Sequence, residues 1–246
     1  MAGLRLIVGL GNPGAEYANT RHNAGFRLVD ALAGREGVRL GPDGKLFGET
    51  GKAVIGGQPV WLLKPMTFMN LSGKSVVAAL RYWKIEPEEA LVVHDELDLP
   101  PGTARLKFDG GHGGQNGLRD IIRLLGHGRF HRLRIGIGHP GHKDRVTGWV
   151  LGRPGKDDEI LIGRAIDDAL DVLPLAVRGA FLALVVLGWP AFLGFKAIVL
   201  PRMNDISTDI VDPPAFSRSA QVLAAREGHV PRELSPQERL PQREAY

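Results

Sequence analysis

The sequence predicts an α/β protein with one main globular domain. Short apolar, β-branched runs alternate along the chain with stretches whose apolar residues recur at helical spacing. The chain has 246 residues, of which 43% are hydrophobic, and this is enough for one well-packed core and an appendage. The clearest single element is the apolar run at residues 4–8, which ends in a loop of Gly and Pro as a buried strand does.

The predicted strands are apolar runs bounded by turn residues. Residues 53–55 and 60–63 are joined through Gly56-Gly57 and predict a hairpin, while residues 132–138 alternate between apolar and polar side chains. The expected strands are 4–8, 53–55, 60–63, 91–93, 104–108 and 132–138.

The predicted helices are stretches with apolar residues three and four apart. They are expected at 22–33, around 76–83, at 118–125 and at 157–177. Thr20 is a candidate cap for the first of them. Residues 34–44 and the glycine-rich residues 110–117 are expected to be loops.

The composition excludes several classes of site. Cysteine is absent, so disulfides, thiol nucleophiles and cysteine-bound zinc are excluded.

The net charge of +4 is compatible with a polyanionic partner, although many basic proteins bind nothing acidic. The apolar run before Gly9 is too short for a signal peptide, and this predicts a cytoplasmic protein.

The chain changes character near Ala180. We expect a catalytic body over residues 1–180, an apolar segment over 181–203, and an appended polar tail over 204–246 without a stable fold. Residues 180–200 are long enough to span a bilayer, which predicts membrane contact, but a buried helix or hairpin packed on the body explains the pattern equally well.

The glycines at 9, 11 and 14 spell G-x-G-x-x-G after a strand, which raises the alternative of a dinucleotide-dependent oxidoreductase. Pro13 interrupts this loop, and no second strand ending in an acidic residue follows the helix. We therefore interpret the glycines as a tight turn with close backbone packing.

His22 and Asp95 are the candidate catalytic pair. Asp95 follows a buried strand, where a carboxylate needs a hydrogen-bond partner, and a paired carboxylate fixes the tautomer of an imidazole. Without a cysteine or a serine elbow, the pair would activate water.

His94, Asp95, Glu96, Asp98 and His112 raise a metal site as a further alternative. Neighbouring residues on a strand point to opposite faces, and no H-E-x-x-H pattern occurs, so we expect no metal.

Two other groups of polar residues are candidate binding residues. Asn12, Asn70 and Asn116 lie in loops and offer amide groups that suit recognition of a peptide. Basic residues spaced by two lie on two strands and fit either a solvated sheet face or phosphate binding: Arg105, Lys107, Arg132 and Arg134.

Long motifs over residues 4–178 resemble the bacterial peptidyl-tRNA hydrolase family. These are GLGNPG at 9–14, Tyr17 with TRHNAG at 20–25, KP with MNLSG at 64–73, HDELDLP at 94–100 and NGLRDI at 116–121. The resemblance implies a monomer with a mixed, twisted sheet flanked by helices on both faces. It also implies hydrolysis of the ester that joins a peptide to tRNA, which recycles tRNA from aborted translation, without metal or organic cofactor.

The resemblance also implies roles for single residues. His22 would be the general base and Asp95 would orient it, while Asn12 would hold the site and the substrate. The remaining assignments are Asn70 and Asn116 for the water and the peptide or its oxyanion, Tyr17 and Met69 for the peptide cleft, and Lys107 and Arg134 for tRNA phosphate. A tRNA-binding module without catalysis is the alternative function.

The chain departs from the family pattern in two places. Gln115 stands where the family has a second histidine, so the mobility of the loop and the pH dependence can differ. The usual family ending is missing after Gly179, and residues from about 204 resemble the start of an unrelated bacterial domain of unknown function, DUF1499-like.

Overall fold

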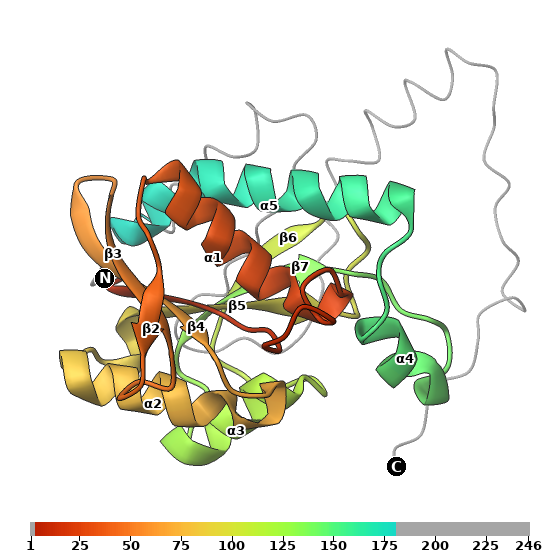
Figure 1. The fold of residues 1–246 in the computed structure, drawn as a ribbon, viewed down its shortest axis with the longest axis horizontal. Helices are drawn as coiled ribbons and strands as arrows, with labels where there is room; N and C mark the ends of the chain where they lie inside the picture. The colour runs from red at the N-terminus through yellow and green to blue at the C-terminus, as the bar shows by residue number, and fades with distance from the viewer. Residues whose placement is uncertain (1–2, 181–246) are drawn as a thin grey trace, which may run out of the picture. The chain divides into compact units, whose positions relative to one another are not determined.

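The structure, a computed structural model, describes residues 3–180 and contains one mixed seven-stranded sheet between two layers of helices (Figure 1). The strands are β1 (Leu6–Gly9), β2 (Gly41–Asp43), β3 (Gly48–Ile55), β4 (Gln58–Pro65), β5 (Ala90–Glu96), β6 (Ala104–Phe108) and β7 (His131–Gly136). The α-helices are α1 (Ala24–Arg35), α2 (Ser72–Trp83), α3 (Asn116–Leu125), α4 (Val146–Val150) and α5 (Lys156–Val177). The 3-10 turns are η1 (Arg21–Asn23), η2 (Met69–Leu71), η3 (Pro87–Glu89) and η4 (Lys143–Arg145).

The strand order β2-β3-β4-β1-β5-β7-β6 places the N-terminal strand in the centre of the sheet. Strand β1 is parallel to β4 and to β5, and β5 is parallel to β7. Strands β2, β3 and β4 pair antiparallel at one edge, and β6 pairs antiparallel with β7 at the other. The carboxyl ends of β1, β4, β5 and β7 therefore meet at one edge of the sheet, where α/β proteins place their sites.

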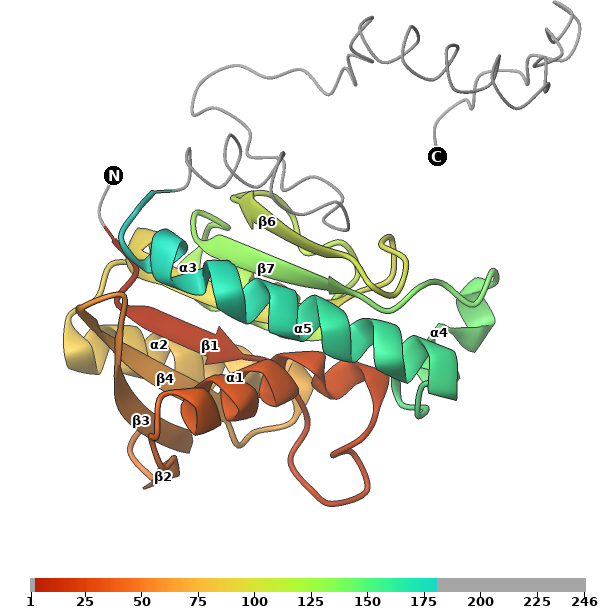
Figure 2. The same ribbon diagram turned by 90° about the horizontal axis from the view of Figure 1, so that it is seen from above.

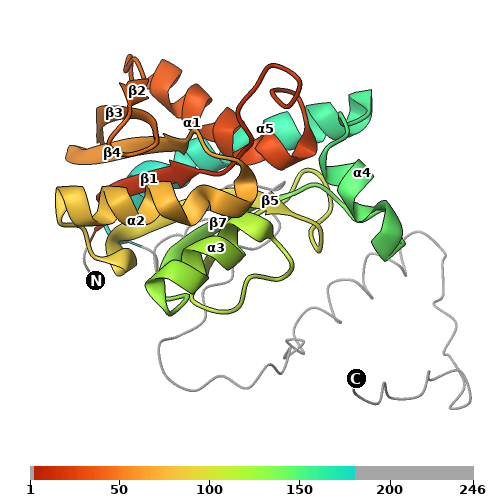
Figure 3. The same cartoon turned by 60° about the horizontal axis from the view of Figure 1, so that its bottom comes forward.

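Helices α1 and α5 cover one face of the sheet, and α2 and α3 cover the other (Figures 1 and 3). Each face has its own hydrophobic core. The first core joins Ile7, Leu28 and Leu170, and the second joins Val8, Val76 and Ile121. Ile7 and Val8 are adjacent and fully buried on opposite faces, which is why the central strand reads as a continuous apolar run.

The expected order of elements is confirmed, with differences at the boundaries. The hairpin strands extend over eight residues each, well beyond the predicted 53–55 and 60–63. Strand β2 lies inside the predicted loop 34–44, because a Gly-Pro-Asp segment becomes a strand only by pairing with β3. Helix α4 was not predicted, since five residues are too few to show a period.

The start of the first helix is also different from the prediction. Thr20 precedes the 3-10 turn η1, and its hydroxyl donates to the carbonyl of Tyr17 at 2.8 Å instead of capping the helix. The α-helix itself begins at Ala24.

The predictions for the apolar segment 181–203 and for the tail 204–246 lie outside the described residues. Among the helices at residues 3–180, none has the length and apolar character that crossing a membrane requires. Figure 2 shows α5 lying along the sheet, as expected of a helix that belongs to the core.

Glycines allow α1 to lie against the ends of β1 and β5. A Cβ on Gly25 would lie 2.4 Å from the backbone nitrogen of Leu10 and 2.4 Å from the carbonyl oxygen of Val93. A Cβ on Gly9 would lie 2.2 Å from the carbonyl oxygen of Gly25, and one on Gly11 would meet the ring of Phe26 at 2.5 Å. Close packing therefore explains these glycines, as predicted, and they need no dinucleotide.

We expect Gly25→Ala to destabilise the protein by about 3 kcal/mol, because the clash is with rigid backbone on both sides. The matched control is Gly34→Ala on the same helix, where an added Cβ meets nothing within 4 Å. The control should be neutral or slightly stabilising. Urea unfolding of both variants measures the difference, and equal stability of the two would show that the helix can move away freely.

Candidate active site

A cleft of about 510 Å³ opens at the carboxyl edge of the sheet, and most of the predicted site residues line it. Its polar lining includes Asn12, His22, Asn70, Asp95, Asn116 and Arg119. Its apolar lining includes Phe68, Met69, Leu97, Val146, Val150 and Leu151. The cleft therefore combines the candidate catalytic pair and amide groups with an apolar wall that suits a peptide.

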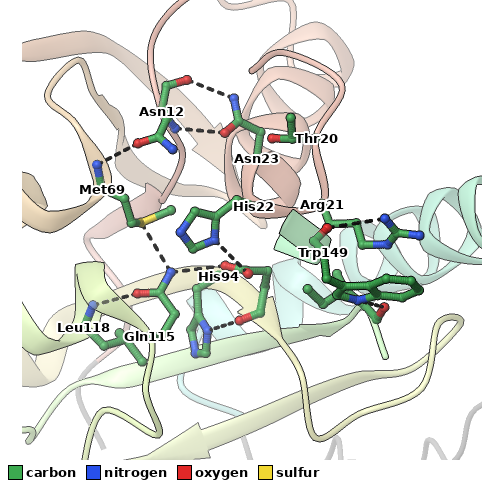
Figure 4. A network of polar contacts seen from close by, with 12 residues as sticks. Asn12, Thr20, Arg21, His22, Asn23, Met69, His94, Gln115, Leu118 and Trp149 are labelled. Carbon is green, nitrogen blue, oxygen red and sulfur yellow. Dashed lines mark hydrogen bonds and ion pairs between the residues drawn. The ribbon is translucent and has the colours of Figure 1, made fainter. Parts of the chain in front are cut away.

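The backbone positions His22 and Asp95 from different segments. Asp95 lies near the end of β5, and its side chain is 3% exposed. His22 lies in η1, directly before α1, and the close packing of Gly25 on β1 and β5 brings this turn over Asp95. His22 Nδ1 lies 2.8 Å from Asp95 Oδ2 (Figure 4).

The geometry assigns the tautomer of His22. An ionised carboxylate accepts only, so Nδ1 carries the proton and donates it to Asp95. Nε2 is then the unprotonated ring nitrogen, and it is free to accept a proton on the cleft side of the ring. This is the arrangement of a general base held by a carboxylate.

Asp95 controls the ionisation of His22. Burial lowers the pKa of His22, but the charge of Asp95 and its hydrogen bond raise it, and the net pKa lies above the ordinary value of 6.5. Burial likewise raises the pKa of Asp95, whereas His22 and Gln115 lower it below its ordinary value. Asp95 therefore stays ionised as the partner of the imidazole.

Asn12 is held by three hydrogen bonds. Its backbone N–H donates to Asn23 Oδ1 at 2.8 Å, and Asn23 Nδ2 donates to its carbonyl at 2.9 Å. Met69 N donates to Asn12 Oδ1 at 2.8 Å (Figure 4). Since the side-chain oxygen is occupied, the amide NH₂ of Asn12 is the group left to contact a ligand in the cleft. The sequence motif contains Asn23, but its role as a clamp on Asn12 was not predicted.

Tyr17 does not line the cleft itself. Its ring lies edge-on against Phe68, with the ring centroids 6.4 Å apart, and Phe68 lines the cleft. Tyr17 therefore borders the apolar side of the cleft through its neighbour.

Lys107 and Arg134 lie outside the cleft, at the β6 edge of the sheet. Arg134 Nε donates to Glu96 Oε2 at 2.8 Å. Burial and the nearby charges of Arg132 and Arg134 lower the pKa of Lys107. Lys107, Arg132 and Arg134 are therefore close enough to repel one another. An anion bound between them would reduce this repulsion.

Arg132 has a different role from its neighbours. It is only 2% exposed, and its guanidinium donates to the carbonyls of Gly110, Gly111 and Gly128. Arg132 therefore holds the start of the glycine-rich loop. The prediction that Arg105, Lys107, Arg132 and Arg134 lie on one solvated sheet face is wrong for Arg132, because its side chain is buried.

The structure separates the residues of the alternative metal site. His94 is buried, and its Nδ1 lies 2.7 Å from the backbone carbonyl oxygen of Asp95 (Figure 4). Within residues 3–180, the His, Asp and Glu side chains form no group of three suited to an ion.

Comparison with known proteins finds relatives over most of the chain. The model of the peptidyl-tRNA hydrolase family matches residues 6–185. A peptidyl-tRNA hydrolase of Stenotrophomonas maltophilia (strain R551-3) is 79% identical over 181 residues, which cover 74% of this chain and 94% of that protein. The corresponding protein of Xanthomonas campestris pv. campestris (strain ATCC 33913) is 76% identical with the same coverage.

A solved structure shows the same fold. The crystal structure of peptidyl-tRNA hydrolase from Acinetobacter baumannii superposes with a TM-score of 0.71 at 54% identity and covers 73% of this chain and 91% of that one.

We predict that the pKa of His22 falls when Asp95 is changed to Asn. The variant keeps the shape of the side chain but removes the charge that raises the pKa, so burial alone remains and lowers it. NMR titration of the imidazole measures the change. An unchanged pKa would show that Asp95 does not set the ionisation of His22.

Proposed function

This chain belongs to the peptidyl-tRNA hydrolase family, whose members cleave the ester bond of peptidyl-tRNA, and we propose that His22 and Asp95 carry out this reaction. The observation that carries the proposal is the buried 2.8 Å pair, which leaves His22 Nε2 open to a cleft lined by three asparagines. The products are free tRNA and the peptide.

The proposed reaction is general-base hydrolysis. His22 Nε2 takes a proton from water, and the water oxygen attacks the carbonyl carbon of the ester. The bond between that carbon and the 3′ oxygen of the ribose then breaks, and the proton passes to the ribose oxygen. Asp95 stabilises the imidazolium that exists between these two transfers.

The asparagines are proposed to bind the substrate. Asn12 presents its NH₂ group, while Asn70 in η2 and Asn116 at the start of α3 line the cleft from two neighbouring elements. Amide groups near the attacked carbonyl can hold the water and stabilise the oxyanion. Met69 and Phe68 are proposed as the apolar side for the peptide, with Tyr17 packed edge-on against Phe68.

Lys107 and Arg134 are proposed to bind tRNA phosphate. Their mutual repulsion favours an anion between them, and the β6 edge that carries them is continuous with the cleft through Glu96, which pairs with Arg134 and also lines the cleft. We propose that the chain acts as a monomer in the cytoplasm, where its substrate arises. We also propose membrane contact through residues 180–200, a segment that contains none of the residues proposed for catalysis or binding.

His22→Ala should lower kcat by about 10²- to 10⁴-fold with little effect on tRNA binding, because only the base is lost. Asp95→Asn should fall between this variant and the native protein. His127→Ala is the control, since that side chain lies outside the cleft. Cleavage of peptidyl-tRNA and binding of deacylated tRNA are measured together, and near-native kcat in His22→Ala would overturn the mechanism.

The raised pKa of His22 also predicts the pH profile. The base must be neutral, so kcat/KM should fall as the pH drops through a value above 6.5.

Lys107→Ala and Arg134→Ala should weaken cleavage of full tRNA substrates far more than cleavage of short mimics with only the 3′ end. Each lost phosphate contact should reduce the slope of log K against log salt by about one. Lys45→Ala is the control, because this exposed cation lies in the β2–β3 connection at the opposite edge of the sheet. Native salt slopes in both variants would leave these residues without a role in binding.

A further inference from the structure

Gln115 lies against the proposed catalytic pair. It directly precedes α3, and each end of its side-chain amide has a partner. Its Oε1 accepts from the backbone N–H of Leu118 at 2.9 Å, and its Nε2 donates to Asp95 Oδ1 at 3.1 Å. Nε2 also lies 3.3 Å from the sulfur of Met69 (Figure 4).

The orientation of this amide follows from its partners. A backbone N–H can only donate, so the oxygen of Gln115 must face Leu118. The carboxylate of Asp95 can only accept, so the NH₂ group must face Asp95. A reversed amide would lose both hydrogen bonds.

The two oxygens of Asp95 therefore have different partners. Oδ2 accepts from His22, and within residues 3–180 Gln115 is the only group that donates to Oδ1. Because Asp95 is buried, loss of this donor would leave Oδ1 unsatisfied and the carboxylate free to turn about its side-chain bonds. The direction of the Nδ1–H bond of His22, and with it the aim of Nε2, depends on that carboxylate.

We propose that Gln115 is a positioning residue, which locks the Asp95 carboxylate behind His22 and joins that carboxylate to the N-terminus of α3. The inference rests on the proposed role of His22 and Asp95. The next residue, Asn116, lines the cleft, so the same hydrogen bonds set the distance between the base and a substrate-binding amide. A glutamine donor does not titrate, so this lock is present at every working pH.

Few ionisable groups face the pair that Gln115 adjusts. His94 and Glu96 lie on β5 beside Asp95, and Glu96 is paired with Arg134. Arg119 reaches the cleft from α3, and η1 contributes His22 itself and Arg21, which pairs with Asp158. A change in the pH profile on substitution of Gln115 therefore reports on the pair.

Gln115→Glu separates the two ends of the side chain. A carboxylate oxygen still accepts from Leu118 N, so the helix cap and the Tm should be retained. The donor to Asp95 is replaced by a second negative charge. We expect kcat to fall about 10- to 100-fold with KM within about twofold, and the acid limb of the profile to move to higher pH because the charge favours the imidazolium.

Gln115→His is the matched rescue variant, because a neutral imidazole again offers an N–H to Asp95. Its kcat at pH 8.5 should return to within about threefold of the native value, and its profile should gain a further ionisation. If Gln115→Glu keeps the native kcat and acid limb, or if Gln115→His is as slow as Gln115→Glu, the proposal is overturned.

NMR titration of His22 without substrate tests the role of Gln115 independently of the proposed catalytic role of His22. Gln115→Glu should raise the pKa of His22 whether or not His22 is the base. An unchanged His22 pKa in a folded Gln115→Glu protein also contradicts the proposal. Near-native kcat in His22→Ala would instead overturn the catalytic assignment.

Discussion

The contact between α1 and the ends of β1 and β5 is the constraint on which the site depends. It requires glycine at positions 9 and 25, where a Cβ would lie 2.2–2.4 Å from backbone atoms. Because the helix lies this close, the turn that precedes it places His22 directly over Asp95. In dinucleotide-binding proteins the glycines of a G-x-G-x-x-G pattern leave room for the pyrophosphate of the ligand. In this protein Gly9 leaves room for helix α1.

This packing buries most of an imidazole and a carboxylate side by side at the wall of the cleft. Each group alone would be driven towards its neutral form by burial, and the pair avoids this because the charge of one stabilises the charge of the other. The cost of burying Asp95 is further offset by the hydrogen bond from Gln115. His22 is thereby kept in one tautomer, with Nδ1 bonded to Asp95 and Nε2 unprotonated.

The loops whose side chains are proposed to bind the substrate are tied to the same framework. Asn12 is clamped by Asn23 and bonded to Met69, and Arg132 holds the carbonyls of Gly110 and Gly111 at the start of the glycine-rich loop. Arg21, the neighbour of His22, stacks on Trp149 and donates to its carbonyl, so η1 is also fastened to α4. Six separate segments of the chain line the cleft, and these polar bonds hold several of them in place.

The sequence by itself determined the α/β class, the order of most elements and the family resemblance, and it predicted most of the polar residues that line the cleft. It could do so because hydrophobic periodicity and turn residues are local signals, and because the long motifs keep their spacing. It did not reveal β2, the short helix α4, the clamp of Asn23 or the separate role of Arg132. Each of these depends on partners far along the chain, such as β3 for β2 and the loop at Gly110 and Gly111 for Arg132. Only the tertiary structure decided that Gln115 donates to Asp95, since a hydrogen bond between residues 20 positions apart follows from how β5 and α3 pack and not from the order of the residues.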